Sequence, residues 1–576
     1  MRTLTLRTGM TKSIGIGGSN FRELIDKNLL FVDKTLFIKE VIEDESKVRL
    51  ITRPRRWGKT LNMSMLHYFF SPEVDGQKTE GLFDKLLISK EPENYIAKHQ
   101  GKYPVIFLSL KDVKQLNFNS AITSIILLIQ DIYSQHRYLL NSPTLADDEQ
   151  HFFKQILTDN LPTEKISASL RKLSEFLYRH FKQKVYILID EYDTPLNFAR
   201  GQEYFDHIAL FMKNFLGATL KDNNYLEKGV LTGILRISKD SMLSGLNNLE
   251  VYTTLYDPLY APYFGFTDQE LDPLFADQNL VKNEGQVKAW YNGYCINGLT
   301  LYNPWSIMSC LKNKARLGSY WLDTGNDDLL KELLLQATPV VKTQLQQLVE
   351  GNAVTVTVNK TMRFDQVNTD QTMLWNLLIS AGYLKVLDTQ YQNEESSVEC
   401  SVAIPNREVL GVYHGIFLRW LTIDQTMEAR AFIHLLAIGR VQEFATAIES
   451  FLKIAASVHD YAHQPEAFYH GLMLALTVSL IDKYFILSNR EGGLGRPDLV
   501  IIPKDTTQTL AVILEFKTVT DKQTLEQRAQ EGLQQIQARD YSAIIAPYDH
   551  IQTISSVGMA FDGKQVLCLE KLGNKL

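Results

Sequence analysis

The chain has 576 residues, of which 45% are apolar and 22% are charged, and its formal net charge is −6. This length is too great for one hydrophobic core, so we expect roughly two to four domains, and without a global basic field any nucleic-acid site must be a local groove. Four widely spaced cysteines without a CxxC pair favour a reducing, cytoplasmic compartment over a zinc or disulfide framework, and no apolar run reaches the ~18 residues of a membrane span.

A P-loop pattern occupies residues 48–70. A short strand expected at 48–52 leads into a loop at 53–60 that ends in Gly-Lys-Thr, and an apolar helix is expected over 61–70. Strand, loop and helix in this order bind phosphates through backbone N–H groups at the helix start. Lys59 would reach the outer phosphates, and Thr60 would offer its hydroxyl to magnesium.

The loop departs from the usual P-loop at one position, because Arg53 stands where the first glycine is expected. Pro54 and the additional arginines must therefore shape the loop. A chance Gly-Lys-Thr in a basic turn is the alternative interpretation. The loop residues expected to contact the nucleotide are Arg55, Arg56, Trp57, Gly58, Lys59 and Thr60.

A strand of the fully buried type, expected over 184–190, ends in the acids Asp190 and Glu191. Another strand, at 103–110, comes between it and the loop. In P-loop ATPases such a Walker B strand supplies an Asp for magnesium and a Glu that polarises the attacking water. The alternative is a core strand that ends in a polar cap.

A further strand, expected over 229–236, carries polar residues toward its end. Thr232 and Arg236 are candidates for sensing the terminal phosphate. A capped strand end with a solvated arginine explains the same residues equally well, so both interpretations stay open.

The pattern from about 268 to 424 is mostly helical, with a few strands. Asn303 before a proline predicts a helix start. An apolar helix over 374–384 ends at glycine, and a strand pair follows near 384–387 and 398–404. A helix followed by a hairpin is compatible with a winged-helix module, and a helical lid or spacer is the alternative.

Two adjacent strands near the C-terminus bring charged residues to one sheet edge. Side chains alternate across a strand, so Glu515 and Lys517 share one face, and Asp498 opens the preceding strand beside Glu515. Two carboxylates and an ammonium group are costly as bare neighbours. A divalent cation would neutralise the acids while the lysine orients a water or a phosphate. A solvated sheet edge is the alternative.

Helices are expected on both sides of these strands. The preceding helix places Glu466 and His470 four residues apart on one face. His470 is either a substrate contact or a residue packed near the site. A second helix is expected over 525–536, and a further strand over 541–546.

The N-terminal motifs resemble the bacterial AAA-ATPase-like family, whose loop also reads Arg-Pro-Arg-Arg-aromatic-Gly-Lys-Thr/Ser. The absent glycine is therefore a family trait. The resemblance implies an ATP-binding domain with ATP and Mg²⁺ as cofactors. The segments that carry it are Asn20–Ile25, Phe31–Thr35, Arg53–Thr60, Asp190–Asp193, Thr232–Gly233, Ser244–Leu249 and Trp290–Tyr294.

The C-terminal order of elements resembles the PD-(D/E)XK nuclease superfamily, in the branch fused behind AAA-ATPase-like domains. The resemblance implies that Asp498 and Glu515 ligate magnesium and that Lys517 activates the water or holds the scissile phosphate. Glu466 would complete the acidic set, and Gln535 would orient the substrate.

These expectations describe an α/β multidomain protein with an AAA-like P-loop ATPase domain at 1–267, a mostly helical, winged-helix-like middle at 268–427, and a restriction-endonuclease-like nuclease fold at 428–576. The expected function is an ATP-binding and ATP-hydrolysing protein coupled to a Mg²⁺-dependent nuclease. Its expected partners are nucleic acid, DNA in preference to RNA, and further copies of the chain in an ATP-dependent oligomer. The alternatives are a STAND-like signalling or scaffold protein with an inactive nuclease fold, and a secreted bacterial effector or toxin.

Overall fold

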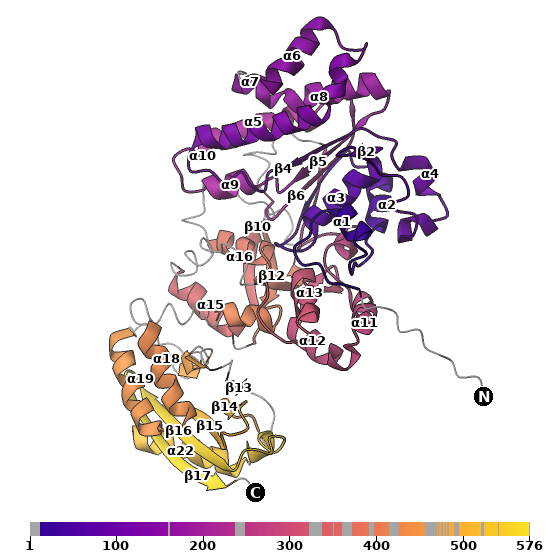
Figure 1. The fold of residues 1–576 in the computed structure, drawn as a ribbon. Coiled ribbons are helices and arrows are strands. Elements are labelled where there is room, and N and C mark those ends of the chain that lie inside the picture. The colour runs from indigo at the N-terminus through magenta and orange to yellow at the C-terminus, as the bar shows by residue number, and fades with distance from the viewer. Residues whose placement is uncertain are drawn as a thin grey trace, which may run out of the picture. The chain divides into compact units, whose positions relative to one another are not determined.

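A computed structural model describes residues 12–158, 162–236, 248–321, 337–349, 351–359, 371–390, 397–413, 426–455, 469, 470, 472, 473, 476, 477, 480, 483–488, 495–519, 523–539 and 541–574. The chain divides into two compact units (Figure 1). The first unit comprises Met1–Gly325 and Thr355–Glu408, and the second comprises Asn326–Val354 and Val409–Leu576. The three-domain division expected from the sequence stays a prediction.

A parallel sheet of five strands, in the order β4-β5-β6-β1-β7, forms the centre of the first unit. Strand β6 therefore lies between the strand that precedes the loop and the strand that ends in Asp190. Every residue of β1 and β5 is buried, which agrees with their continuous apolar sequences. The strands are β1 (Val48–Thr52), β4 (Val105–Ser109), β5 (Val185–Asp190), β6 (Leu226–Gly233) and β7 (Leu249–Tyr252).

Helices cover both faces of this sheet, with α5, α8 and α10 on one side and α1, α2 and α3 on the other (Figure 1). A short hairpin of β2 (Glu73–Val74) and β3 (Gln77–Lys78) follows α3. The helices are α1 (Phe21–Asp26), α2 (Leu36–Glu43), α3 (Lys59–Phe70), α4 (Tyr95–His99), α5 (Phe118–Gln135), α6 (Asp147–Leu157), α7 (Thr163–Ser167), α8 (Ser169–Phe181), α9 (Thr194–Ala199) and α10 (Phe205–Leu220).

The remainder of the first unit mixes helices with two small sheets. Asn303 accepts hydrogen bonds from the backbone N–H groups of Trp305 and Ser306, so it caps α13 as its sequence predicts. The expected helix and hairpin are α16, β11 and β12, and β10 joins them as a third strand. The winged-helix assignment stays a prediction. The elements are α11 (Asp268–Asp277), α12 (Glu284–Tyr291), β8 (Tyr294–Ile296), β9 (Leu299–Leu301), α13 (Pro304–Lys312), β10 (Val354–Asn359), α16 (Gln371–Ser380), β11 (Lys385–Gln390) and β12 (Ser397–Ala403).

A mixed sheet of five strands, in sequence order, forms the second unit. Only β15 and β16 pair in parallel, and the other neighbours are antiparallel. The elements are α15 (Pro339–Val349), α18 (Thr426–Ala437), α19 (Val441–Ala455), β13 (Tyr484–Ser488), β14 (Leu499–Pro503), β15 (Leu510–Thr518), α22 (Leu525–Ala538), β16 (Thr553–Asp562) and β17 (Gln565–Asn574).

The two faces of this sheet pack into two separate cores. Leu514 and Phe516 belong to the core shared with α18 and α19, whereas Ile513 belongs to the core shared with α22. Because side chains alternate along a strand, Glu515 and Lys517 project from the face that α22 covers.

One expected element is wrong. Residues 541–546 do not form a strand, because Tyr541–Ile544 is a 3-10 helix and the next strand is β16. Tyr541, Ile544 and Ile545 are all buried. A short apolar run with this spacing is as typical of a buried helical turn as of a strand.

Within the described ranges, no helix combines the length and the apolar character that crossing a bilayer requires. The thiols of all four cysteines are free, and those of Cys310, Cys400 and Cys568 are buried.

Candidate functional site

The phosphate-binding loop joins β1 to α3 at the carboxyl end of the parallel sheet. Gly58 has a φ of +80° immediately before α3, a conformation that glycine adopts without strain. The ammonium group of Lys59 lies 3.1 Å from Arg53 O, 3.0 Å from Pro54 O and 3.3 Å from Glu191 Oε1. The lysine is buried at the centre of the loop, where phosphate oxygens would replace these partners.

Arg53, which stands in place of the usual glycine, has a structural position. Its side chain is fully buried and forms an ion pair with Asp257, which is buried too. It also donates to Thr52 O at 2.7 Å, and it lies over the ring of Phe264. The start of the loop is thus shaped by a buried ion pair and not by backbone freedom.

The carboxylate of Asp190 accepts hydrogen bonds from hydroxyl groups of three different elements. Its Oδ2 accepts from Thr60 Oγ1 at 2.8 Å and from Ser109 Oγ at 3.4 Å, and its Oδ1 accepts from Thr232 Oγ1 at 2.6 Å. Burial, and then the charge of Glu191, raise the pKa of Asp190. The structure therefore brings Thr60 and Asp190 into direct contact.

Glu191 follows Asp190 and has a φ of +52°, a backbone angle that residues other than glycine rarely adopt. The strained turn aims its carboxylate at Lys59. Thr232 lies at the site, but Arg236 follows three residues after the end of β6. Among the described residues, no hydrogen bond links Arg236 to the loop, and its role in sensing a phosphate stays a prediction.

The remaining loop residues contact the downstream part of the first unit. The guanidinium carbon of Arg56 lies 3.7 Å from the ring centroid of Trp305. Trp57 is buried, and its ring meets that of Tyr294 edge-on at 4.9 Å between centroids. The backbone carbonyl of Arg55 accepts from Trp321 Nε1 at 3.2 Å.

A cavity of about 310 Å³ opens beside the loop. It is lined by the loop itself, by Gly15–Ser19, by Phe31 and Val32, and by Trp305 and Met308 of α13. Lys59, Thr60 and Glu191 all line this cavity.

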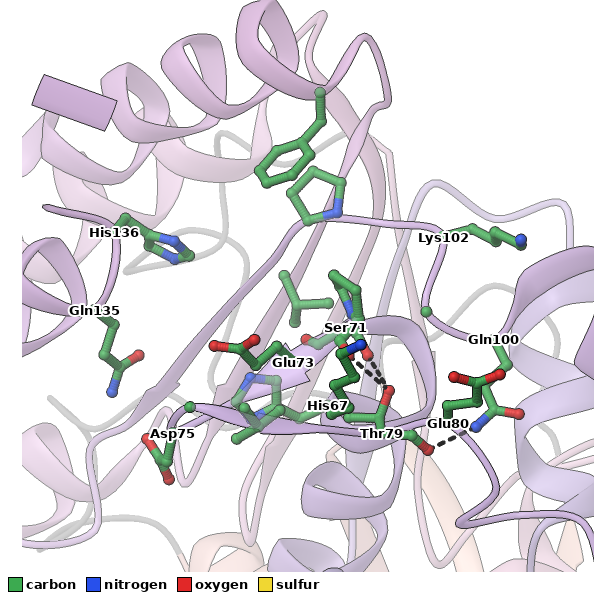
Figure 2. A pocket seen from close by; sticks show the side chains of 18 of the residues that line it. His67, Ser71, Glu73, Asp75, Thr79, Glu80, Gln100, Lys102, Gln135 and His136 are labelled. Carbon is green, nitrogen blue, oxygen red and sulfur yellow. Dashed lines mark hydrogen bonds between the residues drawn. The ribbon is translucent and has the colours of Figure 1, made fainter. Parts of the chain in front are cut away.

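A larger cavity of the first unit lies elsewhere. It measures about 950 Å³ and is lined by the β2–β3 hairpin and by the carboxyl ends of α3, α5 and α8 (Figure 2). His67 and His136 line it, as do Glu73 and Asp75. Pro104 and Val105 at the start of β4 also line it, so it lies at the end of the sheet opposite the loop.

The candidate nuclease site lies on the face of the second sheet that α22 covers. The pairing of Leu499 with Leu514 continues to place Asp498 opposite Glu515. The Oδ2 atom of Asp498 accepts from the backbone N–H of Phe516 at 2.7 Å. Lys517 Nζ lies 3.4 Å from Glu515 Oε1. The structure therefore brings the two acids and the lysine together, as the alternation of the strands predicts.

Glu515 is the most deeply buried of these charged groups, with 2% of the residue exposed. Its Oε1 accepts from Lys517 and from Gln535 of α22, whereas its Oε2 is buried without a hydrogen-bond partner in the described part of the chain. Burial, and then the negative charge of Asp498, raise the pKa of Glu515 to about 7.

Two glycines let α22 approach the sheet closely enough for Gln535 to reach Glu515. A Cβ atom on Gly558 of β16 would lie 2.1 Å from Ala529 O, inside the helix backbone. A Cβ atom on Gly532 of α22 would lie 3.2 Å from Glu515 O. The helix thus lies directly on the strands beside the site.

His470 supports the backbone at this site. It is 8% exposed, and its Nε2 lies 3.1 Å from Asp498 O, so Nε2 carries a hydrogen and donates a hydrogen bond to this carbonyl. Glu466, the third expected acid, lies outside the described residues.

The residues present fit a divalent cation in their chemistry. The described part of the chain contains no group of three or more His, Cys, Asp or Glu side chains that could hold a metal. However, Glu515 Oε2 is a buried carboxylate oxygen without a partner, next to a second carboxylate. Such an arrangement is costly unless a positive charge compensates it.

Sequence reasoning missed the residues that support the loop. Asp257, Trp305 and Trp321 lie far from the loop in sequence, and no motif marks them. Asp193 could have been recognised from the sequence, because it is the last residue of the Asp190–Asp193 motif. It is buried and accepts from the backbone N–H groups of Ile234 and Leu235 at 3.0 and 2.9 Å, so it ties β5 to the end of β6.

Comparison with known proteins identifies two domains in the chain. Residues 14–243 match the family described as predicted AAA-ATPase, and residues 464–571 match the PD-(D/E)XK nuclease superfamily. The chain thus carries an AAA-ATPase-like domain followed by a PD-(D/E)XK nuclease-like domain, as its motifs predicted. It is also similar to an uncharacterized protein in the vnfD 5' region of Azotobacter chroococcum mcd 1. The two are 25% identical over 473 residues, which is 80% of this chain and 81% of that protein.

Proposed function

We propose that this protein is a nucleotide-regulated, metal-dependent nuclease that cleaves DNA at the carboxylate site of the second unit. The observation that carries the proposal is the buried, unpartnered Oε2 atom of Glu515 beside Asp498. A buried carboxylate oxygen without a hydrogen-bond partner, next to a second carboxylate, is costly, and a bound divalent cation would compensate this cost.

In the first unit, Lys59 binds the outer phosphates of ATP. Thr60 and Asp190 hold the magnesium ion that accompanies the nucleotide, and Glu191 orients the attacking water. The strained backbone of Glu191 favours this role, because such strain is retained where it positions a functional group.

In the second unit, Asp498 and Glu515 would hold Mg²⁺, which would polarise the scissile phosphate and supply a nucleophilic water at neutral pH. Gln535 fixes Oε1 of Glu515 and so leaves Oε2 for the ion. The ammonium group of Lys517 holds a phosphate oxygen or orients the attacking water. Glu466 would supply a third acid.

The test is cleavage of plasmid DNA with Mg²⁺, in the presence and absence of ATP. We expect Glu515→Gln to lower the rate by about a hundredfold or more, the scale of removing one electrostatic contact to the reacting group. Lys59→Ala should retain metal-dependent cleavage and lose its response to ATP. Glu526→Gln, at an exposed position of α22, is the matched control and should cleave as the wild type does.

If the wild type cuts no DNA or RNA with any divalent metal or nucleotide, the proposal is wrong. Binding of ATP without cleavage would then favour the scaffold alternative, a signalling protein with an inactive nuclease fold. A cytoplasmic location and ATP-dependent self-association stay predictions.

A further inference from the structure

Residues from the downstream part of the first unit hold the phosphate-binding loop at five consecutive positions. These supports come from residues 257–382, beyond the 14–243 match to the ATPase family. Each pairs a loop residue with a residue of the same unit. The pairs are Arg53 with Asp257, Pro54 with Gly382, Arg55 with Trp321, Arg56 with Trp305, and Trp57 with Tyr294.

The contacts at Pro54 and Trp57 belong together. Gly382 has a φ of +87°, and a Cβ atom there would lie 3.0 Å from Pro54 Cβ. Tyr294 packs on Trp57 and donates its hydroxyl to Gly382 O at 2.9 Å. Tyr294 and Gly382, which this hydrogen bond joins, therefore lie against the two ends of the Pro54–Trp57 segment.

The two tryptophans that touch the arginines are held by one carboxylate. Glu408 Oε2 accepts from Ser306 Oγ at 2.7 Å, and Ser306 is the neighbour of Trp305 in α13. Glu408 Oε1 accepts from the backbone N–H of Trp321 at 2.7 Å. The residue is 1% exposed, so these bonds are formed away from water.

We propose that Glu408 is a positioning residue for the nucleotide site and holds Trp305 and Trp321 against the loop. Nucleotide binding and the ordering of Glu408 and these two tryptophans therefore depend on each other. The inference rests on the proposed function of the loop. It deepens that function by naming the element through which the loop is regulated.

The physical reason is the composition of the loop. Glycines usually allow a P-loop to wrap phosphates, and here the first of them is replaced by Arg53. The shape of the loop must then come from its surroundings. Contacts that preorganise a site raise its affinity, and by linkage the ligand stabilises those contacts to the same extent.

The position of Glu408 in the chain suggests which segment an ordered loop would act on. It is the last residue of the first unit, and the chain continues from it into the second unit at Val409. Residues 407–413 form one helix. A nucleotide that orders the loop would therefore order the start of this helix, the connection that leads to the nuclease-like domain.

The test uses the full chain with ATP and Mg²⁺ and has two readouts. Calorimetry measures ATP affinity, and hydrogen exchange measures protection of residues 403–413 with and without ATP. We expect Glu408→Gln to weaken ATP binding about tenfold, the scale of one charged hydrogen bond, and to abolish the ATP-dependent protection. Glu149→Gln, whose partner is Arg179 on α8, is the matched control and should show wild-type values in both readouts.

Trp321→Phe keeps an aromatic ring at this position and removes the Nε1 donor to Arg55 O. We expect it to weaken ATP binding about threefold to tenfold, and we expect the double variant with Glu408→Gln to lose less than the sum of the two. This variant keeps the proposal testable if Glu408→Gln does not fold.

The outcomes separate the two proposals. If the wild type does not bind ATP, the proposed function of the loop fails. If the wild type binds ATP but the Glu408 and Trp321 variants bind it equally well, and residues 403–413 show no ATP-dependent protection, the positioning role is wrong and the proposed function stands.

Discussion

The two candidate sites differ in how far along the chain their parts are separated. The carboxylate site takes all its described acids, its lysine and its glutamine from Asp498–Gln535. The phosphate-binding loop takes its supports from residues as distant as Asp257, Trp321 and Gly382. One site is a product of local strand alternation, and the other is a product of tertiary packing.

This difference has an energetic counterpart. Asp498, Glu515 and Lys517 lie around a buried oxygen of Glu515 that has no hydrogen-bond partner among the described residues, so a bound cation would stabilise the second site. The buried charge of Arg53 at the loop is already paired with Asp257. We therefore expect substitutions at the loop to act through stability and positioning, and substitutions at the carboxylate site to act through metal binding.

The largest effect should come from breaking the buried pair at the loop. Asp257→Asn would leave the fully buried Arg53 without its counter-charge, which typically costs about 3–5 kcal/mol. Chemical denaturation should show this loss in the transition of the first unit and leave that of the second unit unchanged. Asp26→Asn, which removes a solvent-exposed pair with Arg22, should cost less than about 1 kcal/mol. Equal effects of the two variants would show that the Arg53 pair does not shape the loop.

The next largest effect concerns the packing of α22 on the sheet of the second unit. Gly558→Ala would place a Cβ atom 2.1 Å from Ala529 O, so α22 must move away from the sheet. We expect a loss of about 1–3 kcal/mol in the second unit, together with weaker cleavage because Gln535 is carried by this helix. Gly573→Ala on β17 is the matched control, because nothing lies within 4 Å of its added Cβ. A variant at Gly558 that is as stable as the control would contradict the close packing.

The sequence predicted the local site better than the distant one for physical reasons. Strand alternation alone places Glu515 beside Lys517, and a buried strand that ends in Asp190 predicts its position at the sheet edge. The burial of Arg53 could not be predicted, because its partner Asp257 lies in an irregular segment 204 residues away in the sequence. The misassigned strand at 541–546 failed because a short apolar run does not distinguish a strand from a buried turn.

The smallest effect concerns the cavity opposite the loop (Figure 2). Burial, and then the neighbouring His136, lower the pKa of His67 to about 4. The unfolded chain therefore takes up a proton before the folded protein does, and stability falls as the pH decreases from about 6.5 toward 4. We expect His67→Gln to remove on the order of 1 kcal/mol of this loss, measured by denaturation across that pH range. An unchanged pH profile for His67→Gln would contradict the lowered pKa of this histidine.

Titration of nucleotide-free protein with Mn²⁺, followed by calorimetry, tests whether Asp498 and Glu515 hold a divalent cation. We predict that the wild type binds Mn²⁺ at a site that is lost in Glu515→Gln and retained in Lys59→Ala. If Glu515→Gln binds Mn²⁺ with the same stoichiometry and affinity as the wild type, the carboxylates do not hold the ion and the proposed chemistry is contradicted.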